Sequence, residues 1–218
     1  MSKKILMVVT NHTTITENMK TGLWLEEFAV PYLVFKEQGY EVKVTSISGG
    51  EVALDPNSVQ DNPEWKEAEA LLKDTEKLSK EDASGFDAIF LPGGHGTMFD
   101  FPNNETLLYV LQQFAEADKV IGSVCHGPAG LVNATYKDGT PIVKGKKISA
   151  FTDTEEKEMQ LDAYMPFMLE TALREKGADF VQGEKWADHS IRDGNLVTGQ
   201  NPQSSKSTAE KLVASLEQ

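Results

Sequence analysis

The stretch that decides the fold is VIGSVCHGPAG, residues 120–130, which holds the only cysteine in a chain of 218 residues. The apolar, β-branched run that ends at residue 124 predicts a buried parallel strand, and small residues surround the cysteine where that strand stops. A helix is expected to begin near Gly127. This order of strand, sharp turn and helix places Cys125 at the carboxyl end of a strand in an α/β sheet, where such folds carry their functional sites.

Cys125 has the surroundings of a nucleophile. A lone cysteine is usually a buried, inert side chain. Here Ser123 and Gly127 lie two residues before and two residues after it, a pattern that resembles the G-x-S-x-G nucleophile elbow with cysteine in place of serine. Such an elbow strains the backbone of its central residue and requires small neighbours. The start of the expected helix would favour a thiolate, so we expect a lowered pKa for Cys125.

A nucleophile of this kind needs a proton acceptor, an acid that orients the acceptor, and donors for an oxyanion. His126 follows the cysteine directly, and at a sharp elbow it can reach the sulfur and accept its proton. Residues 151–156, after another expected strand, offer three acids that could orient this histidine, and their spacing does not choose among them. The PGGHG loop, residues 92–96, has neither the order of a dinucleotide-binding loop nor that of a P-loop. We expect its amides, with the amide of His126, to face an oxyanion.

Glu27 is an unusual feature of the first expected helix, which begins near residue 22 and ends at Gly39. It falls on the apolar stripe of that helix, where a carboxylate is costly to bury unless it is protonated or paired. A protonated Glu27 would donate a hydrogen bond to a nearby thiolate and exchange protons with a substrate. A structural accident without a chemical role is the alternative.

Repeated strands, glycine loops and helices predict one α/β domain over residues 1–218, with a mostly parallel sheet that helices cover on both faces. The first βαβ unit spans residues 4–46, and Pro31 is expected to kink its helix. The acidic, lysine-rich residues 64–81 are expected to form solvated helix and loop. The other expected elements are strands at 87–91, 119–124 and 147–151 and near Phe180 and Leu196, and helices at 105–117, 159–176 and 204–216.

The formal net charge of −13, without a cluster of lysine and arginine, argues against nucleic acid and anionic membranes as partners. No segment approaches the roughly 20 apolar residues of a membrane span. A single cysteine cannot form an internal disulfide, so we predict a cytoplasmic protein. The four histidines, at positions 12, 95, 126 and 189, match no zinc-binding spacing, and no metal is predicted.

Five blocks in a fixed order carry a family resemblance over nearly the whole chain: TGLWLEEFAVPY, FLPGGHGTMFDFP, SVCHGPA, GKKISAFTDTEE and DGNLVTGQNPQSS. With these blocks the sequence resembles the ThiJ/PfpI branch of the class I glutamine amidotransferase-like superfamily. More narrowly, it is similar to the group of heat-shock chaperones and glutathione-independent glyoxalases III. The resemblance implies a flavodoxin-like α/β sandwich with a small lid-like addition, and a homodimer.

The resemblance also implies roles for individual residues. Glu156 is implied as the acid of a catalytic triad with Cys125 and His126, and Glu155 is the alternative for that role. The late histidine, His189, lacks the His-x-Glu pair of true glutamine amidotransferases, so glutamine hydrolysis is not expected and His189 is expected to be structural. The implied catalytic residues are Cys125, His126, Glu27 and Glu156, and the implied oxyanion or substrate-binding residues are Gly94, His126 and His95.

The activity that the resemblance implies needs no cofactor. A glyoxalase III of the D-lactate dehydratase type converts an α-oxoaldehyde such as methylglyoxal to a hydroxy acid, lactate, and deglycation of a glycated protein would be the same chemistry. The alternatives are a stress-induced holding chaperone for unfolded proteins, a cysteine peptidase, and a peroxide-sensing thiol. An exposed apolar patch would favour the chaperone, and a pocket larger than a small aldehyde would favour the peptidase.

Overall fold

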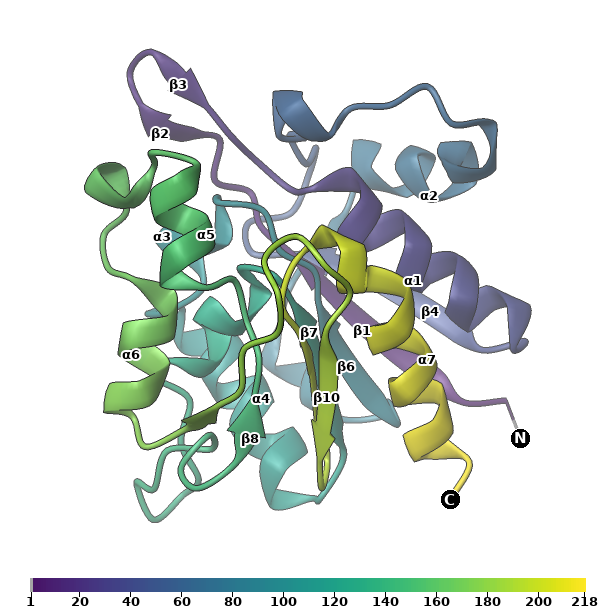
Figure 1. Cartoon of the computed structure of the whole chain (residues 1–218). Coiled ribbons are helices and arrows are strands. Elements are labelled where there is room, and N and C mark those ends of the chain that lie inside the picture. Colours follow the sequence, from purple (N-terminus) through teal and green to yellow (C-terminus); the bar gives the residue numbers. More distant parts are fainter. Residues whose placement is uncertain (1) are drawn as a thin grey trace.

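A seven-stranded sheet forms the centre of the molecule in a computed structural model that describes residues 2–218 (Figure 1). Its strands are β1 (Lys4–Val9), β4 (Glu41–Ser46), β5 (Glu76–Lys77), β6 (Ala88–Leu91), β7 (Val120–Val124), β10 (Ser190–Asp193) and β11 (Leu196–Gly199). They lie in the order β10-β11-β7-β6-β1-β4-β5, and every neighbouring pair is parallel except β10 and β11. The mostly parallel α/β sandwich predicted from the sequence is therefore confirmed, although the antiparallel edge strand β10 was not predicted.

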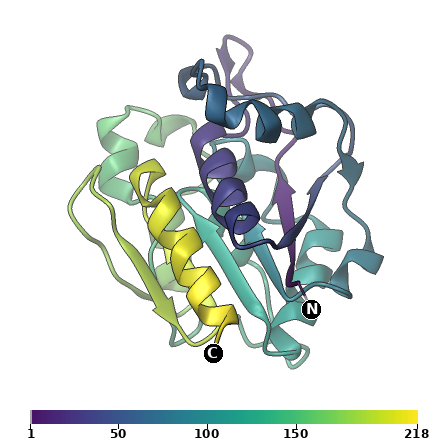
Figure 2. The same cartoon turned by 90° about the vertical axis from the view of Figure 1, so that its right-hand side faces the viewer.

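Helices cover both faces of this sheet, which explains why its central strands consist almost entirely of buried residues. On one face, α1 (Leu25–Glu37) and α7 (Ser205–Leu216) lie side by side (Figure 2). On the other face lies α4 (Glu105–Glu116), which packs against β6 and β7. These helices agree with the predicted ones to within a few residues, and Pro31 lies inside α1.

The carboxyl ends of the parallel strands carry connecting segments, some of which form the site. The hairpin of β2 (Thr14–Thr16) and β3 (Met19–Lys20) follows β1, α3 (Thr97–Asp100) follows β6, and the 3-10 helix η5 (Gly127–Leu131) follows β7. Because the carboxyl ends of parallel strands meet at one edge of a sheet, these loops converge there. The remaining helices are η1 (Pro56–Ser58), η2 (Pro63–Trp65), α2 (Lys66–Ala70), η3 (Leu71–Lys73), η4 (Lys80–Ala83), α5 (Asp153–Glu158), η6 (Asp162–Tyr164), α6 (Leu169–Glu175) and η7 (Pro202–Ser204).

Three of the expected segments differ in the structure. Residues 159–176, expected to be helical, form only η6 and α6, and residues 165–168 between them belong to no helix. Residues 64–81 are not simply solvated, because apolar residues scattered among the charges, such as Trp65 and Leu72, are buried, and β5 joins the edge of the sheet. The strand expected at 147–151 is only β8 (Lys147–Ile148), which pairs with β9 (Asp179–Phe180) in a separate two-stranded sheet. The amide of the next residue, Ser149, donates to the side chain of Thr198 on β11.

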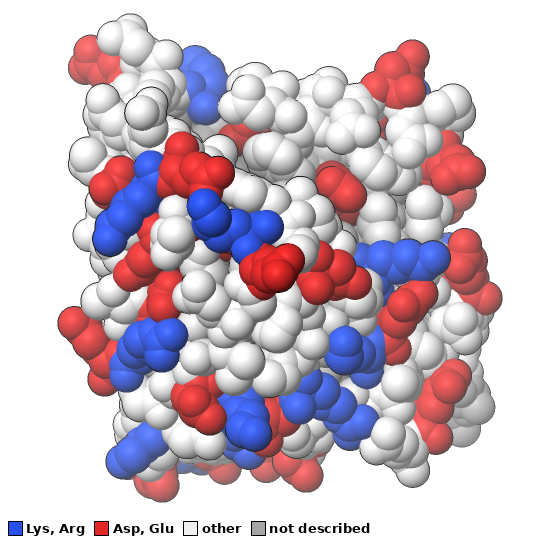
Figure 3. Space-filling model, viewed as in Figure 1, with Lys and Arg blue, Asp and Glu red and all other residues white. Residues whose placement is uncertain are grey.

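The surface carries both charges in close mixture. On the face shown in Figure 3, lysine and arginine side chains lie among aspartate and glutamate rather than in a patch of their own. Opposite charges therefore neutralise one another locally on this face, although the chain carries a net charge of −13. Within residues 2–218, no helix combines the length and the apolar character that crossing a membrane requires.

Candidate active site

Cys125 lies in the turn between β7 and η5, in a backbone conformation that residues other than glycine rarely adopt. Its φ is 58°, in the left-handed region. The Cys125 amide donates to Gly199 O at 3.0 Å, and the Phe151 amide donates to Cys125 O at 2.9 Å, so neighbouring segments hold the strained residue in place. A Cβ at Gly127 would lie 2.2 Å from Leu91 O. The structure thus contains the strained elbow, and the need for a small neighbour, that the sequence predicts.

Burial determines the resting state of the thiol. Cys125 is only 3% exposed, and burial raises its pKa well above the ordinary value, with the carboxyl of Glu27 adding to the rise. The helix expected after it is the five-residue 3-10 helix η5, because Pro128 and two glycines disfavour a regular α-helix. A helix this short does not offset the burial, so the predicted lowering of the Cys125 pKa is wrong. The resting sulfur is a neutral thiol and needs a base.

His126 is placed to be that base. Its Nδ1 lies 3.4 Å from Cys125 Sγ, and its Nε2 lies 2.6 Å from Oε2 of Glu156. An ionised carboxylate can only accept hydrogen bonds, so Nε2 carries the proton and the lone pair of Nδ1 faces the thiol. Burial, and next the neighbouring His95, lower the pKa of His126, while Glu156 opposes them. The ring is therefore neutral at rest and can accept the proton of the sulfur.

Glu156 holds the far side of that ring from α5. Burial by itself raises the pKa of Glu156, but the charge and hydrogen bond of His126 and the hydrogen bond of His95 outweigh burial and hold the pKa well below its ordinary value. The carboxylate is 4% exposed. In the described part of the chain, Glu156 is the acid of the 151–156 run that bonds to His126.

Glu155, the neighbour of Glu156, faces a different set of partners. It is completely buried, and a capping box with Thr152 ties it to the first turn of α5. Its other oxygen accepts bonds from segments far along the chain, so it joins the pocket wall to α5. These donors are the Trp186 amide at 2.9 Å, Gln200 Nε2 at 3.1 Å and Asn201 Nδ2 at 3.0 Å.

Glu27 reaches the sulfur from α1. Its side chain is completely buried, and its Oε2 accepts a bond from the Gly93 amide at 2.7 Å. Burial raises the pKa of Glu27 well above its ordinary value, and hydrogen bonds with Cys125 and Gly93 oppose that rise only in part. Within residues 2–218, its Oε1 has no hydrogen-bond partner of ordinary geometry. Glu27 is therefore a neutral acid beside the thiol.

The loop after β6 brings backbone amides to the same place. Gly94 has a φ of 105°, and a Cβ there would lie 2.2 Å from Gly22 O, so only glycine fits. A Cβ on the preceding Gly93 would lie 2.7 Å from the amide nitrogen of His126. Among the described residues, the amides of Gly94 and His126 have no hydrogen-bond acceptor. Both amides can therefore donate to an oxyanion.

Comparison with known proteins identifies the family of this fold and site. The model of the DJ-1/PfpI family matches residues 15–215. The chain belongs to the DJ-1/PfpI family. Glyoxalase 3 of Candida albicans is 34% identical and covers 98% of both chains, and a glutathione-independent glyoxalase of Schizosaccharomyces pombe is 35% identical, over 96% of this chain and 94% of its own. The crystal structure of glyoxalase III from Candida albicans has a TM-score of 0.90 at 32% identity, over 98% of this chain and 97% of that chain.

His95 of this DJ-1/PfpI chain binds the second oxygen of Glu156, with Nε2 2.6 Å from Oε1. The ring centroids of His95 and His126 are 4.0 Å apart. One potential metal-ligand atom each of His95, His126 and Glu156 lies within 4.8 Å of the other two. In the described part of the chain, this is the cluster whose residue types and spacing could hold a metal ion. Two short contacts to one carboxylate are those of charge-assisted hydrogen bonds, and we interpret the group as a hydrogen-bonded network.

The other two histidines lie outside the pocket that Cys125 lines. The ring of His12 stacks on Phe99, with centroids 4.4 Å apart. The amide of His189 donates to Ser204 Oγ at 3.0 Å. Neither contacts the nucleophile, which agrees with the structural role predicted for His189.

The reactive groups line a pocket of about 140 Å³, close to the size of a cavity that holds one benzene molecule. Glu26 also lines it, and burial raises the pKa of this half-buried carboxyl. The sequence does not assign the apolar walls to the site, because helical or strand periodicity shows which residues are buried but not which of them face a pocket. Only their places in or near the five family blocks point to them. These wall residues are Trp24, Phe151, Met159, Trp186 and Pro202.

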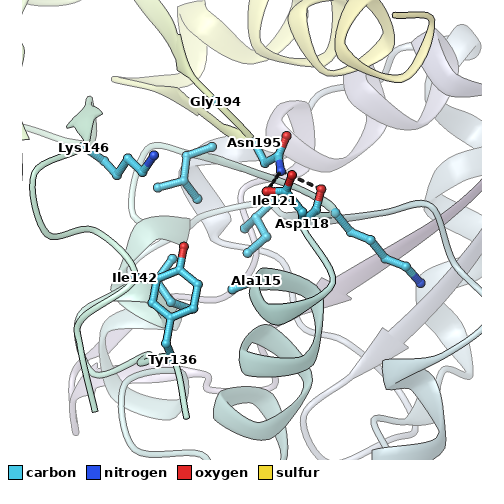
Figure 4. Close-up of a pocket in the computed structure, with 10 residues that line it drawn as sticks. Ala115, Asp118, Ile121, Tyr136, Ile142, Lys146, Gly194 and Asn195 are labelled. Carbon is cyan, nitrogen blue, oxygen red and sulfur yellow. Dashed lines mark hydrogen bonds between the residues drawn. The ribbon is translucent and has the colours of Figure 1, made fainter. Parts of the chain in front are cut away.

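A hollow of similar size, about 150 Å³, lies at the opposite end of the sheet (Figure 4). Ile121, near the start of β7, lines it together with Tyr136 and Lys146, and Asn195 there is hydrogen-bonded to Asp118. None of the predicted site residues lies in this hollow. The size of a hollow therefore does not identify the site in this fold, whereas the carboxyl end of β7 does.

Proposed function

We propose that this chain is a glutathione-independent glyoxalase of the glyoxalase III type, which converts methylglyoxal-like α-oxoaldehydes to hydroxy acids. Cys125 is the nucleophile, His126 is its base, Glu156 orients the base, and Glu27 exchanges protons with the substrate. The names of relatives that match nearly the whole chain support this activity. The observation that carries the proposal is a thiol between a neutral base and a neutral acid: Sγ lies 3.4 Å from Nδ1 of His126 and beside the buried Glu27 carboxyl.

In the first step, the sulfur adds to the aldehyde carbon of the substrate, C1. His126 accepts the S–H proton at Nδ1 while the S–C1 bond forms, and the aldehyde oxygen takes the electron pair of the C1–O π bond. The free amides of Gly94 and His126 hold that oxygen. The proton on His126 then passes to the oxygen, which gives a hemithioacetal and returns the base to its neutral form.

The second step moves hydrogen between neighbouring carbons. His126 removes the proton from C1, the electron pair of that C–H bond forms the C1–C2 double bond, and the C2 carbonyl oxygen takes its π electrons together with the proton of the C1 hydroxyl. The C1 oxygen then forms a C=O bond while the C1–C2 π electrons take a proton from Glu27 at C2, and Glu27 recovers a proton from His126. C1 is then a thioester carbon and C2 an alcohol carbon, so one is oxidised while the other is reduced. Water cleaves the thioester, which releases lactate in the case of methylglyoxal and restores the thiol. The sum is the addition of one water molecule, so the balance requires no external oxidant or reductant.

The size and lining of the pocket favour a small, neutral aldehyde. A volume of about 140 Å³ is well below the roughly 300–1,000 Å³ of pockets for larger ligands. Among the described residues that line it, none is a lysine or arginine that could bind an anion. A peptide would need a larger groove, so the peptidase alternative gains no support. The holding chaperone gains none either, because the exposed large apolar side chains among the described residues are few: Val59, Leu71, Tyr109 and Tyr164.

The test is lactate formation from methylglyoxal without glutathione, by the wild type, Cys125→Ala and Glu27→Gln. The proposal predicts turnover by the wild type and its loss in both variants, and stereospecific lactate dehydrogenases would show D-lactate. A folded wild-type protein that makes no lactate, although Cys125 still reacts with iodoacetamide, would overturn the proposal. A glycated peptide as substrate would test whether deglycation accompanies this activity.

The homodimer and the cytoplasmic location stay predictions. Sedimentation at several protein concentrations would test the dimer. Fractionation of the source cells would test the location.

A further inference from the structure

The second histidine of the site, His95, has no part in the steps above, yet its position is closely fixed. It is 3% exposed, and its Nε2 lies 2.6 Å from Glu156 Oε1, while His126 takes Oε2 at the same distance. The loop that carries it passes close to the neighbouring backbone. A Cβ on Gly96, the next residue, would lie 2.7 Å from His12 O. The fold therefore places this ring against one oxygen of one carboxylate.

This contact completes the hydrogen bonding of a buried charge. Each oxygen of Glu156 has one N–H donor, and without His95 the oxygen Oε1 would lose its donor in a buried place, which is costly. The carboxylate would then be free to turn away from the ring of His126. Nε2 of His95 donates to Glu156 in this contact, so its N–H is not available to a substrate oxygen.

We propose that His95 is a positioning residue, which fixes Glu156 and through it the tautomer and orientation of His126. This inference rests on the proposed function, in which His126 is the base that activates Cys125. His95 then acts on the sulfur through two other side chains and touches no substrate atom. The proposal replaces the oxyanion or substrate-binding role that the family resemblance implies for His95.

The same contact affects the pH at which His126 acts as a base. The titratable groups that face His126 are His95 from the loop after β6, Glu155 and Glu156 from α5, and Cys125. His95 lowers the pKa of His126, and both glutamates raise it. Removal of His95 therefore raises the pKa of His126. Any rate that needs the neutral His126 ring should then begin to fall at a higher pH as the solution is acidified.

Two rates measured against pH test the proposal: alkylation of Cys125 by iodoacetamide, and turnover of methylglyoxal. Alkylation needs an activated sulfur but no oxyanion donors, so it reports on His126 without the glyoxalase reaction. His95→Gln keeps an N–H donor near the position of Nε2, and His95→Phe keeps a ring without donors. His12→Phe is the matched control, because it removes a histidine that lies outside the pocket.

We expect His95→Phe to lower both kcat and the alkylation rate near neutral pH by roughly tenfold, with KM nearly unchanged. The acid limb of both pH profiles should move to higher pH. His95→Gln should recover most of both rates, and His12→Phe should match the wild type. His95→Asn, whose shorter amide does not reach Oε1, should behave as His95→Phe and serves in its place if the phenylalanine variant does not fold.

Unchanged alkylation in His95→Phe, with a raised KM for methylglyoxal, would place His95 on the substrate and overturn the proposal. Equal losses in His95→Gln and His95→Phe would also overturn it, because the N–H donor would then be without effect. If no protein, wild type included, forms lactate while alkylation follows the expected order, the glyoxalase function fails and the positioning role of His95 stands.

Discussion

Two buried carboxyl groups near the same sulfur have pKa values shifted in opposite directions. Glu27, on α1, has a thiol and one backbone amide as its partners among the described residues, and burial holds its pKa well above the ordinary value. Burial also acts to raise the pKa of Glu156, on α5, but His126 and His95 hold that pKa well below the ordinary value. The donors around a carboxyl, more than its depth, thus decide whether it is an acid or an anion. This site has a proton to give at one end and a fixed charge at the other.

The largest effect is expected at the neutral end. Glu27→Gln keeps the shape and the neutral charge but cannot give up a proton, so kcat for lactate formation should fall roughly 10³-fold. Near neutral pH the same variant should be more stable than the wild type, by about 0.5–2 kcal/mol, because a raised pKa means that ionisation favours the unfolded chain. Steady-state kinetics and urea unfolding measure the two effects. A variant that unfolds more easily than the wild type would contradict a neutral Glu27.

A somewhat smaller loss of activity is expected at the charged end, with the opposite effect on stability. Glu156→Gln has one amide oxygen for two histidine N–H groups, so kcat should fall roughly 10²-fold and the free energy of unfolding by about 1–3 kcal/mol. The matched control is Glu158→Gln, an exposed position on the same helix, which should change neither by much. An unchanged stability in Glu156→Gln would show that Glu156 is not a paired anion.

The pH dependence of stability should also differ in sign between the two ends. Stability from Glu156 is present above its ordinary pKa of about 4.5 and is lost as the pH falls below that value. Stability from Glu27 is present below its ordinary pKa of about 4.5 and is lost as the pH rises from there toward its raised folded pKa. Urea unfolding across this range should show that each glutamine variant lacks one of these losses. Curves that run parallel to the wild type would refute both assignments.

The thiol between the two ends should show a smaller effect. Burial and the Glu27 carboxyl raise the pKa of Cys125, so iodoacetamide should alkylate it roughly tenfold more slowly than a free cysteine near neutral pH. Unfolding in urea should remove the difference. Alkylation faster than that of a free cysteine would show a resting thiolate, and would leave His126 without a proton to accept.

The smallest effect on turnover is expected from the neighbouring glutamate. Glu155→Gln keeps the carbonyl that can accept bonds from Trp186 and Asn201, and it lies away from the sulfur, so kcat should change far less than in Glu156→Gln. Its cost should appear in the unfolding midpoint. A larger loss of kcat in Glu155→Gln than in Glu156→Gln would exchange the roles of the two residues.

Much of the fold could be predicted because its signals are local. The strand that ends at Val124 shows its burial in a continuous apolar run, and the small residues Ser123 and Gly127 announce the turn at Cys125. Glu27 was found because a carboxyl on an apolar stripe is conspicuous whatever surrounds it. In each case, residues within about one helical turn along the sequence are enough to make the prediction.

The rest depends on contacts between distant segments. Glu155 and Glu156 are adjacent, and only the positions of His126 and Asn201 decide which of them is the anion beside the base. The pKa of Cys125 was predicted in the wrong direction, because the expected helix shortened to five residues while burial was complete. Neither the length of that helix nor the cover above the sulfur can be deduced from neighbouring residues alone.

The charge states of the two carboxyls can be tested directly by infrared difference spectroscopy near neutral pH. The spectrum of the wild type minus Glu27→Gln should contain the carbonyl stretching band of a protonated carboxylic acid. The spectrum of the wild type minus Glu156→Gln should contain carboxylate bands only. A missing carboxylic-acid band in the first spectrum, or its presence in the second, would contradict a site built from one neutral and one charged glutamate.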